Sequence, residues 1–335
     1  MNAQTPENVA TRRPAGRCLV KRLPRVVLLA LSLLVAVTIV AAGACGGSKP
    51  KPETGFTVTD DLGKTFSFDG PVNSIVSLAP ANTEIVFAIG AGDKLIGRTD
   101  YCNYPPEAAS VESVGSYDSP NKEKVVVLNP DVVLATDINR QSGDTAWLEE
   151  KGLEVITLNP QTLTDILADI SLVGQITGKE AEAGELAADM QSRIDYVAQQ
   201  TAGLSDNQRL HVLHVTWHDP LWTAGQGSFI DAMIEIAGGV NIFHDVTGDV
   251  QVDLETAVTR NPEVITVFTG HGDAMNESYA YVIASDSPFK TTDAYKNGRI
   301  YLVDADLASR PGPRIVEALE MCAKFIHPEI FGQPE

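Results

Sequence analysis

The chain has 335 residues, of which 44% are hydrophobic and 21% are charged, and its formal net charge is −19. Such a composition is typical of a globular protein, and the length allows two lobes with separate cores. The strong negative charge argues against nucleic acid as a partner.

The first 45 residues are predicted to be a signal peptide rather than part of the fold. Six basic residues precede an apolar run at 26–42, and Ala42-Gly-Ala-Cys45 matches a lipobox, in which the cysteine is acylated. An uncleaved signal anchor is the alternative, although 17 apolar residues are few for a span. From Cys45 onward, 19 Lys and Arg face 43 Asp and Glu, a formal net charge of −24, which suits a domain held outside the membrane by lipid chains. Residues 46–55 are predicted to be a flexible tether.

Residues 56–178 are predicted to form an N-terminal lobe of alternating strands and helices. The pattern indicates a hairpin at 56–68 and strands at 73–78, 94–97, 132–135 and 155–158. Helices are expected at 84–89, with Asn82 or Thr83 as the cap, and at 121–128 and 145–151. The first strand, helix and strand lead into the loop Tyr101-Cys-Asn-Tyr-Pro-Pro106, where a ligand could bind at the strand ends.

Two helical patterns follow, at 162–177 and 179–200, and no strand is indicated between them. The motif Thr177-x-x-Glu180 suggests a capping box for the second helix. Its apolar residues recur along one face over about 33 Å. Because this helix lies between two strand-rich halves, residues 179–203 are predicted to connect two lobes.

Residues 204–335 repeat the pattern of the first lobe. Strands are expected at 210–215, 264–268 and 300–303, and a last helix at 313–325. The sequence Asn129-Pro-Asp is echoed by Asn261-Pro-Glu at an equivalent junction between helix and strand. The predicted fold is therefore α/β, with two similar Rossmann-like β/α lobes, a long backbone helix and a ligand cleft between the lobes.

The sequence gives little support for a catalytic or metal-binding function. The chain lacks a Gly-x-Ser-x-Gly elbow, a phosphate loop and cysteine pairs at metal spacing, so neither an enzyme nor a bound cofactor or metal is predicted. His211 and His214 fall on opposite faces of a strand, which disfavours a shared ion. Cys102 and Cys322 could pair in an exported protein, but Cys102 is expected to pack under the tyrosine loop.

Aromatic residues are the better candidates for a site. Tyr101, Tyr117, Trp217 and Trp222 fall in loops at predicted strand ends, in both halves of the chain. Such rings could line a flat apolar cleft of the kind that a macrocycle needs, and His218, His271 and Asp273 could add directed polar contacts.

The segment SLAPANTEIVFAIGAG, at 77–92, followed by TDYCNYPPEA, at 99–108, resembles the opening of the cobalamin-binding proteins that serve ABC importers. These belong to a wider group with a helical backbone that also carries haem and ferric siderophores. The resemblance covers residues 56–327 and implies that Tyr101 and Tyr117 lie against the corrin. It further implies ligand contacts by Trp217, His218, Trp222 and Asp273 from the second lobe.

The resemblance also implies roles for two glutamates and two arginines. It implies that Glu123 and Glu235, one in each lobe, dock onto arginines of the permease. Arg310 and Arg314 match the closing loop of the family, where they either serve ligand carboxylates or cap the last helix.

The resemblance as a whole implies a lipid-anchored monomer on the extracytoplasmic face of the cell membrane. It would capture a corrinoid and deliver it unaltered to an ABC permease. The alternative is haem or a ferric siderophore held by the same architecture. A siderophore site would need several basic residues around the cleft, and the loops of the first lobe offer few.

Overall fold

The computed structural model describes residues 55–269 and 277–334, which form two α/β lobes. In the N-terminal lobe, four parallel strands are ordered β4-β3-β5-β6, and a separate hairpin pairs β1 with β2. The strands are β1 (Phe56–Thr59), β2 (Thr65–Phe68), β3 (Ile75–Ser77), β4 (Leu95–Arg98), β5 (Val132–Ala135) and β6 (Val155–Thr157). The helices are α2 (Pro80–Ala88), α3 (Lys122–Leu128), α4 (Asp137–Gln141) and α5 (Asp144–Glu150).

The C-terminal lobe holds a second parallel sheet, ordered β10-β7-β12-β13, and a small antiparallel sheet, ordered β11-β9-β8. Its strands are β7 (His211–Val215), β8 (Trp217–His218), β9 (Leu221–Ala224), β10 (Val240–Asn241), β11 (Asp249–Gln251), β12 (Val264–Phe268) and β13 (Ile300–Val303). Its helices are α8 (Phe229–Ile236), α9 (Leu254–Thr259), α10 (Glu277–Ile283), α11 (Asp293–Lys296), α12 (Ala305–Ala308), α13 (Ile315–Ile326) and α14 (Pro328–Phe331).

The predicted similarity of the lobes is confirmed by their topology. When strands are counted along the chain within each parallel sheet, the first lies between the second and the third, and the fourth forms the edge beside the third. Asn129 and Asn261 both adopt the left-handed conformation, with φ of 47° and 46°. The acid two residues later then accepts a hydrogen bond from backbone at the start of the neighbouring strand. Asp131 bonds the N–H of Ser74 at 3.0 Å, and Glu263 bonds that of His211 at 2.9 Å.

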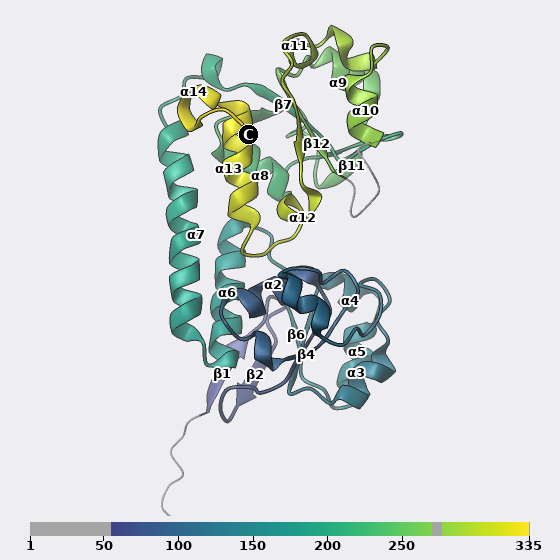
Figure 1. Cartoon of the computed structure of the whole chain (residues 1–335), viewed down its shortest axis with the longest axis vertical. Coiled ribbons are helices and arrows are strands. Elements are labelled where there is room, and N and C mark those ends of the chain that lie inside the picture. The colour runs from purple at the N-terminus through teal and green to yellow at the C-terminus, as the bar shows by residue number, and fades with distance from the viewer. Residues whose placement is uncertain (1–54, 270–276, 335) are drawn as a thin grey trace, which may run out of the picture. The chain divides into compact units, whose positions relative to one another are not determined.

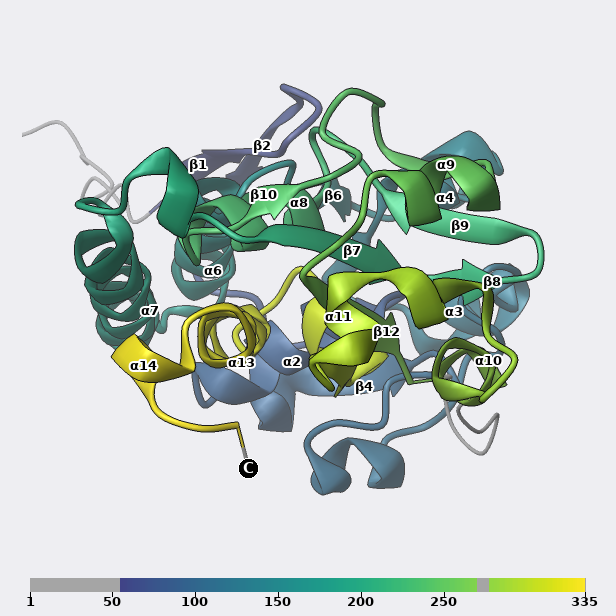
Figure 2. The same ribbon diagram turned by 90° about the horizontal axis from the view of Figure 1, so that it is seen from above.

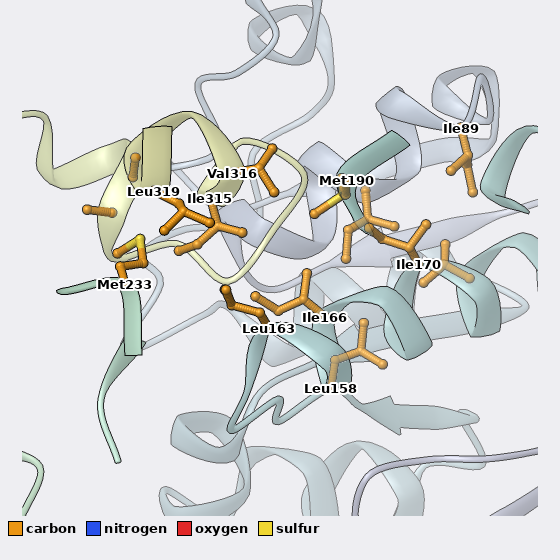
Figure 3. Close-up of a cluster of buried hydrophobic side chains, with 14 of the residues drawn as sticks. Ile89, Leu158, Leu163, Ile166, Ile170, Met190, Met233, Ile315, Val316 and Leu319 are labelled. Carbon is orange, nitrogen blue, oxygen red and sulfur yellow. The ribbon is translucent and has the colours of Figure 1, made fainter. Parts of the chain in front are cut away.

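Two long helices, α6 (Leu163–Thr177) and α7 (Glu180–Thr201), connect the two halves of the chain (Figure 1). Helix α7 packs along α6 and also contacts α8 and α13 of the C-terminal lobe. Its buried residues Ala183, Met190 and Val197 are spaced by sevens and therefore share one face. Figure 3 shows Met190 in one apolar cluster with residues of α6 and α13. This continuous core fastens α7 to elements of both lobes.

Helix α2 starts earlier than the sequence indicated. Its first residue is Pro80, which is well suited to that position because its fixed φ and missing N–H fit the first helical turn. Asn82 and Thr83 therefore lie inside the helix and do not cap it. Their side chains fix the helix to the sheet instead, since the Asn82 amide donates to the Ala135 carbonyl at 3.2 Å and the Thr83 hydroxyl donates to Ser77 Oγ at 2.8 Å.

The capping box predicted at Thr177 is wrong. Thr177 is the last residue of α6, and its hydroxyl donates back to the Val173 carbonyl at 2.6 Å. Gly178 then ends α6 in the left-handed conformation, so α7 begins after Lys179 without a side-chain cap. The structure also contains α4, which the sequence analysis missed.

The two cysteines that the structure describes, Cys102 and Cys322, are both buried and unpaired. Cys102 lies under the tyrosine loop as expected, with its Sγ 3.2 Å from Thr99 Oγ1. Within residues 55–269 and 277–334, no helix has the length and apolar character needed to cross a membrane. The predicted signal peptide, Cys45 and most of the tether fall outside this part of the chain.

Candidate functional site

A cavity of about 810 Å³ is lined by residues from both lobes. Its N-terminal wall is formed by the first turn of α2 and by the segments that follow β4, β5 and β6. These segments follow the carboxyl ends of parallel strands, where α/β folds commonly bind ligands. The C-terminal wall is formed by Phe229 at the start of α8, Asp249 of β11 and the segment 309–311.

Two of the predicted aromatic residues, Tyr101 and Tyr117, line this cavity. Tyr101 is 55% exposed, so its ring is available to a ligand. Tyr117 is half-buried, and burial raises the pKa of its hydroxyl although the hydrogen bond with Thr136 acts in the opposite direction. With Phe229, they give the cavity flat apolar surfaces from both lobes.

The charged residues that the structure describes in the cavity wall are mostly acidic. Asp118, Asp137 and Asp249 line it, whereas Arg310 is the single arginine or lysine among the described lining residues. Desolvation raises the pKa of Asp249. Hydrogen bonds from Arg140 and Gln141 lower the pKa of Asp137. Carboxylates are hydrogen-bond acceptors when ionised, so this wall can receive amide N–H groups.

The guanidinium of Arg310 is already engaged within the protein. Arg310 Nη1 lies 3.1 Å from Glu84 Oε1, and its Nη2 lies 2.6 Å from Asp306 Oδ2. Arg314 binds both oxygens of the same Glu84, at 2.8 and 2.6 Å. We call Glu84, Arg310 and Arg314 the interlobe clamp, because the glutamate belongs to α2 and the arginines precede α13. Arg314 is at the N-cap of α13 but makes no side-chain cap hydrogen bond, so the expected capping role is not seen. Contact with ligand carboxylates stays a prediction for Arg310, which lines the cavity.

Tyr104, the second tyrosine of the loop, has a partner that the sequence did not reveal. The guanidinium of Arg314 lies over its ring, 3.8 Å from the centroid. This cation–π contact joins the tyrosine loop to the interlobe clamp. Tyr104 is not among the residues that line the cavity.

Trp217, His218 and Trp222 lie in strands rather than in loops, which corrects the expectation for them. They form the hairpin β8–β9 around Asp219-Pro220, at the end of the lobe away from α7 (Figure 2). None of the three is among the residues that line the 810 Å³ cavity. His218 contacts Ser278 instead, with its Nδ1 3.0 Å from the hydroxyl.

The two tryptophans nevertheless share a sheet face with a residue of the cavity. Directly paired residues of antiparallel strands point to the same side of a sheet, as do residues two apart in one strand. Trp222 pairs with Trp217 on one side and with Gln251 on the other, and Gln251 is two residues from Asp249. We call this surface the indole face. Both tryptophans are exposed, so a ligand larger than the cavity could extend over them.

The two glutamates predicted to dock onto the permease are both on the surface of the protein. Glu123 is exposed on α3, and Glu235 is exposed on α8 with its Oε1 3.3 Å from His244 Nδ1. Neither lines the cavity.

Asp273 and His271 lie outside the described residues. His211 is exposed and His214 is fully buried, as their positions on opposite strand faces predicted, and burial lowers the pKa of His214 to about 3.

Sequence analysis missed Phe229, Asp137 and Asp249 as cavity residues. The sequence held an indication for Asp137, because this residue comes directly after Thr136 at the carboxyl end of the strand predicted at 132–135. Asp249 lies in a three-residue strand that has no recognisable pattern.

A model of the periplasmic binding protein family matches residues 75–307. The chain belongs to this family. As a periplasmic binding protein it is the solute-binding component of an ABC importer.

Individual relatives differ in what their names say they bind. This periplasmic binding protein is 32% identical to YvrC of Bacillus subtilis, an uncharacterized ABC transporter substrate-binding lipoprotein, over 90% of this chain and 97% of that one. It is 30% identical to the vitamin B12-binding protein of Vibrio cholerae, over 76% and 90% of the two chains. A solved haem-binding protein from Roseiflexus superposes with a TM-score of 0.67 at 25% identity, over 76% and 98% of the two chains.

Proposed function

We propose that this chain is a lipid-anchored monomer that captures cobalamin or a related corrinoid and delivers it to an ABC permease. Support for the ligand class comes from the charges of the cavity. Three carboxylates line it, and its one described guanidinium is held by Glu84 and Asp306. A corrin ring is edged by amide groups that can donate to carboxylates, whereas haem propionates and many ferric siderophores bring anions that need cations.

The size of the site agrees with this proposal. A volume of about 810 Å³ is within the usual range for ligand pockets, near its upper end. The indole face lies next to it and could cover the part of a corrinoid that protrudes. Haem or a ferric siderophore remains the alternative ligand, because the family includes a haem-binding relative of similar fold.

The ligand can be identified by isothermal titration of the purified protein with cobalamin, haem and a ferric siderophore under one set of conditions. We expect cobalamin to bind most tightly. Tighter binding of haem or of the siderophore would overturn the assignment and favour the alternative.

Tyr101→Ala and Trp222→Ala are each expected to weaken corrinoid binding without unfolding the lobes. Losing one stacked aromatic ring should cost about 1–3 kcal/mol, or roughly 5- to 150-fold in Kd. The matched control is Tyr196→Ala, because Tyr196 is 56% exposed on α7 and contacts Phe331 rather than the cavity. If both site variants bind cobalamin like the parent protein, these rings are not part of the site.

Permease docking by Glu123 and Glu235 is tested separately from ligand capture. Replacing both with Ala should leave cobalamin affinity unchanged and reduce the stimulation of permease ATPase activity, because each loses a charge-assisted bond worth about 1.5–3 kcal/mol. Replacing both with Lys should reduce stimulation further through like-charge repulsion. The control replaces Glu180 and Glu185, exposed on α7, with Lys. Full stimulation by both Glu123/Glu235 variants would exclude docking through these residues.

Lipid anchoring through Cys45 is expected to hold the mature protein at the membrane. The Cys45→Ala protein should be released into the soluble fraction, because stable anchoring depends on the acyl chains. Membrane fractionation with mass spectrometry of the N-terminus measures this. A Cys45→Ala protein that stays membrane-bound with residues 1–44 intact would instead indicate a signal anchor.

A further inference from the structure

Three side chains capable of binding a metal gather on the C-terminal lobe, outside the cavity described above. Asp231 and Glu235 are four residues apart on α8 and therefore share one face of that helix. His244, from the segment after β10, points its Nδ1 at both. The three ligand atoms all lie within 4.8 Å of one another.

The two distances from His244 to the carboxylates are close to those between neighbouring ligand atoms of a small divalent ion. His244 Nδ1 lies 3.1 Å from Asp231 Oδ2 and 3.3 Å from Glu235 Oε1. In a tetrahedral zinc site with bonds of about 2.0–2.1 Å, neighbouring ligand atoms are roughly 3.3–3.4 Å apart. An ion could therefore enter among the three groups if the exposed Glu235 and half-buried His244 side chains adjust to it.

Asp231 is held in place for such a role by a second layer of contacts. It is only 4% exposed, and its Oδ1 accepts a hydrogen bond from the buried amide of Asn241 at 2.8 Å. The same amide donates to the Ala224 carbonyl at 2.8 Å, which fixes its orientation. Carboxylate ligands of metal sites are typically oriented by outer partners of this kind. Within the described part of the chain, the hydrogen bonds of Asp231 Oδ2 lead only to His244.

The types of ligand atom in the cluster determine which metal ion it prefers. One imidazole nitrogen and two carboxylates suit zinc and neighbouring transition metals, whereas calcium and magnesium prefer a shell of oxygen ligands. A hollow of about 430 Å³ lies beside His244 and is lined also by Asp245 and Arg260. The exposed Glu235 leaves the cluster open to solvent, from which a fourth ligand could come. We propose that Asp231, Glu235 and His244 form a binding site for a divalent transition-metal ion of the zinc type.

The proposal is tested by isothermal titration of the purified full-length protein with Zn²⁺, and by the visible spectrum of Co²⁺ as a reporter of coordination geometry. We expect the parent protein to bind Zn²⁺ and to give the intense Co²⁺ absorption of a four-coordinate site. Glu235→Gln should weaken Zn²⁺ binding at least tenfold, and His244→Gln should abolish the Co²⁺ band. Mg²⁺ and Ca²⁺ should not compete.

The matched control is Glu329→Gln. His327 Nδ1 and Glu329 Oε1 are 2.8 Å apart and form a comparable histidine–carboxylate pair, for which the described residues supply no third ligand. This variant should bind Zn²⁺ like the parent. Unchanged Zn²⁺ affinity in both Glu235→Gln and His244→Gln, absence of Zn²⁺ binding by the parent, or equal affinity for Mg²⁺ would overturn the proposal. The assay contains neither corrinoid nor permease, so its outcome does not depend on ligand capture. Glu235 is shared with the proposed docking surface, and a bound ion would occupy its carboxylate.

Discussion

Replacing Glu84 with Gln is expected to lower the free energy of unfolding by about 3–5 kcal/mol, because it leaves two largely buried guanidinium groups without their shared carboxylate. Glu84 is only 3% exposed and bonds both Arg310 and Arg314. Glutamine keeps the size of the side chain, so the loss reports the missing charge rather than a cavity. Urea denaturation followed by circular dichroism measures the effect.

The control for this prediction is Glu149→Gln. Glu149 forms an ion pair with Lys64 at 3.0 Å, but both side chains are exposed. Exposed pairs typically contribute less than about 1 kcal/mol, so this variant should be close to the parent. Equal effects of the two substitutions would show that the interlobe clamp adds no more than a surface ion pair.

Replacing Asp169 with Asn is expected to stabilise the protein at neutral pH and to flatten the pH dependence of its stability. Asp169 lies on α6 with 1% exposure, and its Oδ2 has no hydrogen-bond partner among the described residues. Burial, with repulsion from Asp61, raises its pKa from 3.8 to about 9. The folded protein therefore keeps Asp169 protonated at pH 7, where the unfolded chain ionises it.

The difference in the pKa of Asp169 between the folded and unfolded states determines how stability changes with pH. Because the pKa is higher in the folded state, the stabilising effect of protonation is complete below about pH 4 and is lost as the pH rises towards 9. Asparagine is neutral at every pH and its amide can donate to Asp61. At pH 7 the Asp169→Asn variant should gain about 2–4 kcal/mol.

Denaturation at pH 5, 7 and 8.5 measures the predicted change. The curves of parent and variant should converge at low pH and diverge as the pH rises. Asp195→Asn, on the exposed side of α7, should leave the slope unchanged. A slope in the Asp169→Asn variant equal to that of the parent would contradict the assignment.

Regular elements could be predicted because their signals are local. Strand β5 was placed at its true bounds, since a run of buried apolar residues follows the helix-ending Asn129-Pro-Asp. The length of α7 followed from its apolar spacing. The short hairpin β8–β9 was missed because β8 has only two residues and the Asp219-Pro220 turn carries no recognisable hairpin signal.

The site was predictable only in part. Tyr101 and Tyr117 lie near strand ends within one lobe, so local sequence indicated them. The interlobe clamp joins residues more than 220 positions apart. No local rule connects Glu84 with Arg310, because the contact is created by the packing of α2 against the segment before α13. The opposite sign of their charges was visible, but their partnership was not.

Arg310 belongs both to the interlobe clamp and to the wall of the cavity. A ligand group that contacts this guanidinium therefore acts on a side chain that already joins the lobes. If ligand binding strengthens the bond of Arg310 with Glu84, then separating the lobes must weaken ligand binding by the same factor, since coupling between two equilibria is reciprocal. A permease that pulls the lobes apart would thereby lower the affinity of the protein for its cargo, without having to reach the cargo itself.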